Sequence, residues 1–285
     1  MKQIRFDFNS MFDINIGSSH GVSSEELSAL KPALTQAHQH FHGLLRDPST
    51  RVRLSLEWAM LPFQSKEMIR SIQKLAKEIA SGYKHVLFLG IGGSYLGLKA
   101  AQDALLPAYY NEFESVRKGR PQIYFEGNNL DPDTLSVLIK NLNPKKTFCV
   151  VISKSGETTE TKAGFAVVEN WLKKGVGKHY GRQIVAITDP AKGHLRQKVN
   201  SEQAKDKKSF RNLALLPGVG GRFSEFNMGL LHLAVAGVDI DDLLAGAAAM
   251  SRRCSTHDCM KNPALLYAGL QTILYRHKGK SIALM

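Results

Sequence analysis

Five hydroxyl side chains gather where an apolar segment ends, in the stretch VVISKSGETTET at residues 150–161. They are Ser153, Ser155, Thr158, Thr159 and Thr161. Lys154 adds a positive charge, and Gly156 permits a tight turn. Hydroxyls and the free backbone N–H groups of a helix start can hold a dianionic phosphate without a metal. The alternative is a helix cap, rich in serine and threonine, that binds nothing.

A second candidate anion site is the glycine-rich stretch FLGIGGSYLG, residues 88–97. Its central residues Gly92, Gly93 and Ser94 would let the backbone approach a ligand closely. A dinucleotide-binding motif is excluded, because its third glycine would fall where Tyr95 stands, and no nucleotide P-loop lysine follows. A tight turn without a ligand is the alternative.

Other side chains that could do chemistry form weaker patterns. Three glutamates are interpreted as capping or supporting groups: Glu157 and Glu160 in the hydroxyl-rich stretch, and Glu225 in the later segment GGRFSE. The histidines are interpreted as structural or surface residues, including His38, His40, His42 and His232. The segment CSTHDC (254–259) lacks a second pair of ligands, so no metal site is predicted.

Composition narrows the class of protein and its partners. The formal net charge is +13, but the basic residues are scattered. The one dense run, KDKKSFR at 205–211, is interpreted as a solvated loop, and no nucleic-acid partner is expected. No apolar run is long enough for a membrane span, so no membrane partner is expected. Three cysteines, an odd number, do not suggest a disulfide framework and favour a cytoplasmic location.

The elements that must position these residues alternate between strands and helices. Short apolar runs occur at 86–90, 122–127, 147–153, 183–188 and 212–217, and helical stretches separate them. Runs that are apolar on both faces predict an α/β fold with a doubly wound, five-stranded parallel sheet flanked by helices. Such sheets bind ligands at the carboxyl ends of their strands. Both candidate stretches follow strands, so we expect them to face one crevice.

Helices are predicted on both sides of this region. The first covers 23–46, begins with a capping box of Ser23 and Glu26, and is restarted or kinked by Pro32. Another follows Ser65 and ends just before Gly82. From residue 222 the chain is mostly helical until KSIALM, residues 280–285, which we predict to be a strand of a further domain.

Three motifs, in this order along the chain, carry a resemblance to a known family. FLGIGGSYLG and VISKSGETTET resemble the sugar-isomerase (SIS) domain. GVGGRFSEFNMGLLHLAVAG, residues 218–237, resembles the glycine–glycine–arginine motif of the glucose-6-phosphate isomerase (phosphoglucose isomerase) family. The resemblance covers about residues 50–285. It implies an aldose–ketose isomerase of glycolysis and gluconeogenesis that interconverts glucose 6-phosphate and fructose 6-phosphate.

The resemblance also assigns roles to individual residues. The residues that match the family's phosphate-holding loop are Ser153, Lys154, Ser155 and Thr158. Those that match the loop lying against the sugar are Gly92, Gly93 and Ser94. Arg222 matches the arginine that stabilises the negative charge of the cis-enediolate intermediate. The family's hexose 6-phosphate chemistry needs no metal or other cofactor.

Part of the family's catalytic set has no counterpart in this sequence. The family's base is a glutamate in a W-A-E-S-type motif, and a histidine in a G-x-H-Q-type motif helps to open the ring. Neither motif occurs here, and no residue matches the family's C-terminal lysine. The chain therefore resembles the N-terminal part of the family, and we expect it to be inactive alone and homodimeric at full length.

This resemblance suggests three successive segments. They are an N-terminal helical segment (1–82), a sugar-isomerase α/β domain (83–221) and a helical connector (222–285) leading to a second such domain. The alternative function is a non-catalytic regulatory module that binds sugar phosphates with the same domain, because the base is absent.

Overall fold

The computed structural model describes residues 4–283. Its backbone divides into two compact units, which are described separately. The helical unit comprises Met1–Arg51 and Ala245–Met285, and the sheet unit comprises Val52–Leu244. All residues predicted to bind or catalyse lie in the sheet unit. The division into three successive segments stays a prediction.

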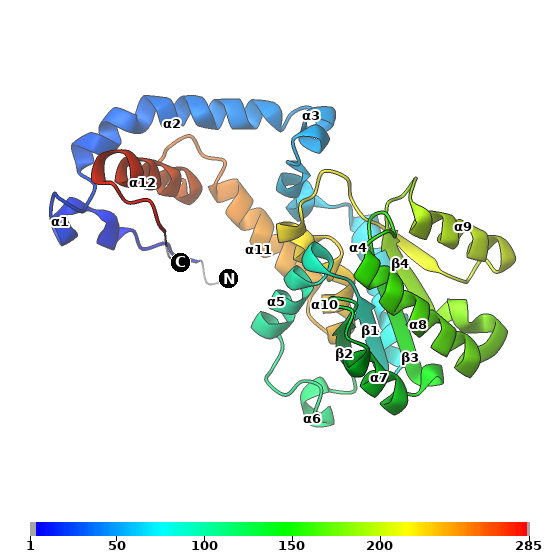
Figure 1. Cartoon of the computed structure of the whole chain (residues 1–285). Helices are drawn as coiled ribbons and strands as arrows, with labels where there is room; N and C mark the ends of the chain where they lie inside the picture. Colours follow the sequence, from blue (N-terminus) through cyan, green and yellow to red (C-terminus); the bar gives the residue numbers. More distant parts are fainter. Residues whose placement is uncertain (1–3, 284–285) are drawn as a thin grey trace. The chain divides into compact units, whose positions relative to one another are not determined.

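The sheet unit is built on five parallel strands in the order β2-β1-β3-β4-β5 (Figure 1). They are β1 (His85–Leu89), β2 (Gln122–Glu126), β3 (Thr147–Ile152), β4 (Ile184–Thr188) and β5 (Arg211–Ala214). This confirms the predicted doubly wound parallel sheet, with β5 shorter than expected. Strands β1 and β3 are neighbours, with Leu89 opposite Val151. The chain reverses its direction of winding between them, which is where such sheets bind ligands.

Helices α4 (Lys66–Gly82), α5 (Leu96–Leu105) and α10 (Gly229–Ala236) cover one face of the sheet. Alternate strand residues such as Phe88, Val150 and Ile187 are fully buried against them. The sequence of helix α4 explains where this helix begins and which face it buries. Ser65 caps its start by accepting a hydrogen bond from the Met68 N–H at 3.2 Å. Four apolar residues on one face of the helix are buried, namely Ile69, Ile72, Ala76 and Ile79. Gly82 is the last helical residue rather than the first one beyond.

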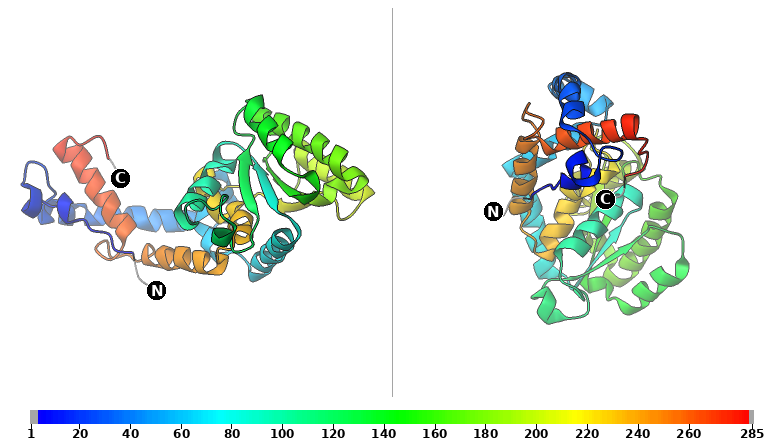
Figure 2. Two further views of the ribbon diagram at one scale, coloured as in Figure 1. Left: turned by 90° about the horizontal axis from the view of Figure 1, so that it is seen from below. Right: turned by 90° about the vertical axis from the view of Figure 1, so that its left-hand side faces the viewer.

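Helices α7 (Pro132–Asn141), α8 (Thr159–Val176) and α9 (His194–Lys205) contribute to the core on the other face. Figure 2 shows the strands between these two layers of helices. Residues of β1 and β3 that point to this side, including Leu89, Cys149 and Val151, pack with Phe165 and Leu195. Burial on both faces explains why the strands read as continuous apolar runs.

The helical unit holds α2 (Ser24–Leu44) and α12 (Pro263–Lys278), which share a small apolar core. The predicted capping box is present: the Glu26 N–H donates to Ser23 Oγ at 3.1 Å, and the Ser23 N–H donates to Glu26 Oε2 at 2.9 Å. Helix α2 continues through Pro32 as one helix. Asn262 caps α12 by accepting from the Leu265 N–H at 3.0 Å.

The remaining elements are short or connect the others. The α-helices are α1 (Asp13–Ile16), α3 (Pro48–Arg53), α6 (Glu114–Arg117) and α11 (Ile240–Arg253). The 3-10 helices are η1 (Asn9–Met11), η2 (Glu57–Phe63), η3 (Gly92–Ser94), η4 (Pro144–Lys146), η5 (Gly177–Gln183) and η6 (Gly221–Phe226). Among the described residues, no helix has the length and apolar character needed to cross a membrane.

The strand predicted at residues 280–285 is wrong over 280–283, which have no regular secondary structure. A single extended segment gains no ladder hydrogen bonds without a neighbouring strand, and none pairs with it in the described part of the chain. Residues 284 and 285 lie outside the described residues.

Candidate active site

The phosphate loop, residues 153–158, joins the end of β3 to the start of α8. Ser153 is 4% exposed, and its Oγ accepts a hydrogen bond from the Gly156 N–H at 3.0 Å. Ser155 Oγ accepts from the Glu157 N–H at 3.1 Å. Because both oxygens act as acceptors in these turns, both hydroxyl protons stay available for an anion.

Thr158 distinguishes between the two interpretations of this loop, a simple helix cap and a binding loop. It occupies the N-cap position of α8, but its side chain makes no capping hydrogen bond. A loop that served only to cap the helix would use this hydroxyl. Thr158 and Lys154 are both exposed. The loop therefore has a hydroxyl that is not used for capping and an exposed ammonium group at the start of an 18-residue helix, where an anion is favoured.

The shape of the phosphate loop is fixed by close packing against the start of α9. Gly156 has φ +79°, and a Cβ there would lie 2.5 Å from the Leu195 nitrogen. The Leu195 N–H donates to the Ser155 carbonyl at 3.4 Å. The Lys154 carbonyl accepts from Thr188 Oγ1 at 3.1 Å, which ties the loop to the end of β4. Any side chain at position 156 would push the loop away from α9.

The glycine loop, residues 90–94, follows β1 and lies at the same edge of the sheet. The Gly90 N–H donates to the Glu126 carbonyl at 3.0 Å. Gly127 touches both sides of the site, because a Cβ there would lie 3.4 Å from the Gly90 nitrogen and 3.6 Å from the Cα of Thr161 in α8. The predicted proximity of the two loops is thus supported by the parallel β1–β3 pair and by this shared neighbour.

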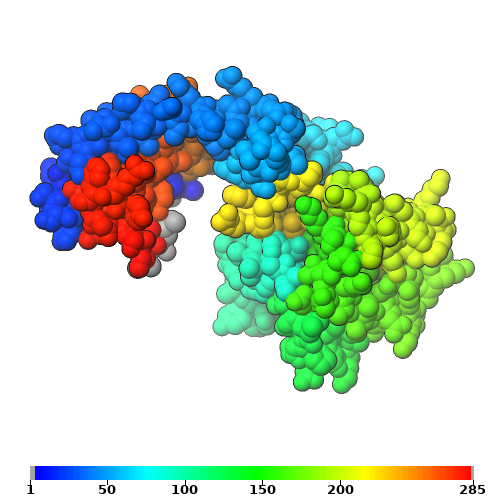
Figure 3. Space-filling view, turned by 45° about the horizontal axis from the view of Figure 1, so that its top comes forward, coloured from blue at the N-terminus to red at the C-terminus, as the bar shows by residue number. Residues whose placement is uncertain are grey.

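The segment that carries Arg222 contacts the glycine loop through two glycines. A Cβ on Gly93 would lie 2.5 Å from the Cα of Gly221, so these backbones touch and no side chain fits between them. Figure 3 shows the yellow segment that includes residue 222 beside the teal segment that holds the glycine loop. Arg222 is exposed and has no hydrogen-bond or ion-pair partner within residues 4–283. Its guanidinium is therefore available to a negatively charged ligand.

Two residues that the sequence analysis did not single out support the Arg222 segment. Trp58 stacks on Phe223 with ring centroids 4.9 Å apart. Gln64 Nε2 donates to the carbonyl of Phe226 at 2.8 Å. Both come from the η2 region, more than 150 positions earlier in the chain. No local pattern could have found them, since their role depends on a tertiary contact.

The three nearby glutamates differ in their surroundings. Glu157 is exposed and pairs with Lys162 and His194. Glu225 is partly buried beside Gly97, and burial raises the pKa of its carboxyl. For Glu160 the structure gives only its position, in the first turn of α8. The protonated form of Glu225 is therefore favoured by its surroundings, as is found for many carboxyls in binding sites.

The fold and site define a doubly wound α/β protein whose strand ends carry a hydroxyl-rich loop, a glycine-rich loop and an exposed arginine. A family model described as "Phosphoglucose isomerase" matches residues 33–280. The chain belongs to the phosphoglucose isomerase family.

Named relatives agree with this assignment. The chain is 36% identical over 283 residues to the glucose-6-phosphate isomerase of Carboxydothermus hydrogenoformans, covering 99% of this chain and 58% of that protein. It is 34% identical over 288 residues to the glucose-6-phosphate isomerase of Shouchella clausii, covering 100% of this chain and 60% of that protein. The chain thus spans less than two thirds of the length of these relatives.

Solved structures show the same fold. A crystal structure of a hypothetical protein from Thermus thermophilus matches with a TM-score of 0.74 and 32% identity, covering 89% of this chain and 55% of that one. The glucose-6-phosphate isomerase of Chlamydia trachomatis matches with a TM-score of 0.62 and 20% identity, covering 90% of this chain and 51% of that one.

Proposed function

We propose that this chain supplies the phosphate-binding and charge-stabilising part of an isomerase that interconverts glucose 6-phosphate and fructose 6-phosphate. The observation that carries the proposal is the meeting of three features at one sheet edge. The phosphate loop, the glycine loop and the Arg222 segment follow different elements of the sheet unit, yet the Gly93–Gly221 and Gly127 contacts bring them together.

The phosphate group would bind at the phosphate loop. The hydroxyls of Ser155 and Thr158 would donate to its oxygens, and Lys154 would add charge. The N-terminus of α8 favours the same dianion. A phosphate held there orients the sugar toward the glycine loop, where a backbone without side chains at Gly92 and Gly93 permits close approach.

Arg222 would act on the intermediate rather than on the phosphate. Transfer of a proton between C2 and C1 places negative charge on oxygen, and a fixed guanidinium stabilises that charge. The proton itself needs a base, and no residue of this sequence matches the family's glutamate. We therefore expect the chain to bind hexose 6-phosphate without turning it over.

The family match favours this enzyme function over the regulatory module. A cytoplasmic location belongs to the same proposal and is supported by three free thiols, Cys149, Cys254 and Cys259. The homodimer expected at full length also stays a proposal, which light scattering on the full-length protein would test.

The test is calorimetric titration of the 285-residue chain with glucose 6-phosphate. The double variant Ser155→Ala/Thr158→Ala should bind at least about tenfold more weakly, because each hydrogen bond to a charged group contributes about 1.5–3 kcal/mol. A matched control, Thr134→Ala/Ser136→Ala on α7, removes the same hydroxyl types outside the loop and should bind normally. Unchanged affinity in the first variant would remove the phosphate loop from the site.

A coupled assay for fructose 6-phosphate tests the catalytic part. The 285-residue chain should show no turnover above background. Robust turnover would contradict this assignment and would make Glu225, with its raised pKa, the first residue to replace. In an active full-length protein, Arg222→Ala should lower kcat far more than substrate binding, since its partner charge develops only during the reaction.

A further inference from the structure

A cavity of about 220 Å³ lies between α8 and α9, on the sheet face opposite α4. Its walls are mainly apolar and come from β3, α8 and α9: Val151, Phe165, Ala166 and Leu195. Ser153 and Gly156 of the phosphate loop line it as well. The cavity extends along α8 to Glu169, well beyond the loop that would hold the sugar phosphate.

One side chain in this cavity has an unmet hydrogen bond. Thr161 is 2% exposed, lines the cavity, and its Oγ1 has no hydrogen-bond partner in the part of the chain that the structure describes. A buried hydroxyl without a partner destabilises a protein, because it has lost its hydrogen bonds to water. A ligand that accepts a hydrogen bond from this hydroxyl would remove the penalty.

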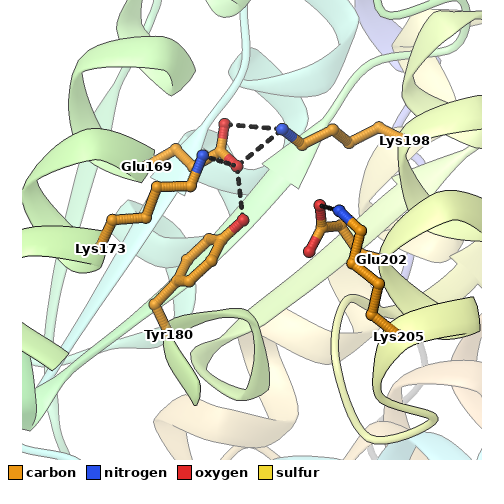
Figure 4. A network of polar contacts seen from close by, with 6 residues as sticks. All are labelled: Glu169, Lys173, Tyr180, Lys198, Glu202 and Lys205. Carbon is orange, nitrogen blue, oxygen red and sulfur yellow. Dashed lines mark hydrogen bonds and ion pairs between the residues drawn. The ribbon is translucent and has the colours of Figure 1, made fainter. Parts of the chain in front are cut away.

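The charges around the cavity favour an anion. Glu169 already has three partners, as Figure 4 shows: Lys198 Nζ at 2.7 Å, Lys173 Nζ at 3.0 Å and Tyr180 OH at 2.8 Å. Burial alone would raise the pKa of Glu169, but these partners outweigh it and hold the pKa below its ordinary value. Two carboxylates, Glu169 and the neighbouring Glu202, thus face three ammonium groups, those of Lys173, Lys198 and Lys205, which leaves an excess of one positive charge.

The rim of the cavity supplies further hydrogen-bond donors. Lys162 and His194 line the cavity and share a single acidic partner, Glu157. Lys162 lies 3.6 Å from the Glu157 carboxylate and is largely exposed, so it can turn toward a ligand. An anionic group at the mouth would meet at least one ammonium that is weakly paired.

The volume sets the size of the ligand. An apolar protein cavity of about 150 Å³ is large enough to hold benzene. A cavity of about 220 Å³ can therefore take one ring together with a carboxylate. We infer that the α8–α9 cavity is a second binding site, which takes a small organic monocarboxylate with its apolar body against Phe165 and Leu195 and its anionic head near Thr161 and Lys162. This inference does not rest on the proposed isomerase function, although Ser153 and Gly156 border both sites.

The test titrates the 285-residue chain with benzoate and, separately, with cyclohexanecarboxylate, followed by NMR chemical shifts. Saturable shifts should centre on the residues that line the cavity, and uncharged benzyl alcohol should bind at least about tenfold more weakly. Ala166→Trp fills the cavity and should abolish binding. Ala163→Trp, also on α8 and exposed but outside the cavity lining, is the matched control and should bind normally.

Thr161→Val provides a second, independent readout. Removal of the unpartnered hydroxyl should make the empty protein more stable to urea and should weaken carboxylate binding several-fold. A variant that loses stability, or that binds as tightly as the original, would contradict the role of this hydroxyl.

Three results would overturn the proposal. They are no saturable binding of either probe, unchanged binding in Ala166→Trp, and complete competitive displacement by inorganic phosphate. The last result would assign the probes to the phosphate loop. Because Ala166→Trp should still bind inorganic phosphate, failure of this inference is distinguishable from failure of the proposed isomerase site.

Discussion

Two adjacent glycines in the sequence GGR should respond in opposite ways to the same substitution. A Cβ on Gly221 would lie 2.8 Å from the Cα of Gly93. Carbon atoms prefer about 3.5–4.0 Å, so the overlap is about 0.7 Å or more, and both sides are backbone. Gly220 has φ −79° and ψ 157°, and a Cβ there would have no atom within 4 Å.

The expected free energies follow from this geometry. Gly221→Ala should destabilise the sheet unit by about 1–3 kcal/mol, the usual effect of overpacking. Gly220→Ala should be neutral or stabilise by about 0.4–1 kcal/mol, because alanine reduces the freedom of the unfolded chain without strain in the folded one. The two variants should therefore differ by roughly 1–4 kcal/mol.

The assay is urea unfolding followed by tryptophan fluorescence. Both tryptophans, Trp58 and Trp171, lie in the sheet unit, so the signal reports on that unit. Gly93→Ala should cost at least as much as Gly221→Ala, because its Cβ would lie 2.5 Å from Gly221. The double variant should cost less than the sum, since both changes strain one contact. Equal stability of Gly221→Ala and Gly220→Ala would refute the close contact that places Arg222.

Two further predictions concern pH. His232 is fully buried, its Nε2 lies 2.9 Å from the acceptor Gln102 Oε1, and burial lowers its pKa to about 3. Since the folded pKa lies below the unfolded value of about 6.5, stability should fall as pH drops below about 6.5, by about 2 kcal/mol between roughly pH 6.5 and 5. His232→Gln should remove that share of the slope in urea titrations, and an unchanged slope would show that the histidine does not take up the proton. Glu169→Gln should cost about 2–4 kcal/mol at about pH 7, because Lys173 and Lys198 lose the negative charge that they pair with. The pKa of Glu169 is lowered in the folded protein, so its contribution to folding stability is present above the ordinary pKa of 4.5 and is lost as the pH falls below it. A stability difference between Glu169→Gln and the original protein that stays constant from about pH 7 to about pH 3.5 would contradict the ionic role.

Local patterns in the sequence account for most of the sheet unit. Continuous apolar runs predicted all five strands, because a parallel sheet covered on both faces leaves no polar alternation. Ser65 and the apolar stripe after it predicted α4, since capping and helical periodicity act within a few residues. The same reasoning failed at residues 280–283, where an apolar, β-compatible composition does not supply a neighbouring strand.

The candidate site also combines features that the sequence predicted with features that only the structure shows. The sequence by itself determined which residue types follow β1 and β3, and the motifs identified the phosphate loop, the glycine loop and Arg222 as one family pattern. Only the tertiary structure decided that the Thr158 hydroxyl makes no capping hydrogen bond and that Gly93 contacts Gly221. The Gly93–Gly221 contact joins segments more than a hundred residues apart in the sequence, and local sequence patterns do not predict contacts between such distant segments. The α8–α9 cavity is likewise a feature that only the tertiary structure reveals, because it arises from the way two helices pack against each other.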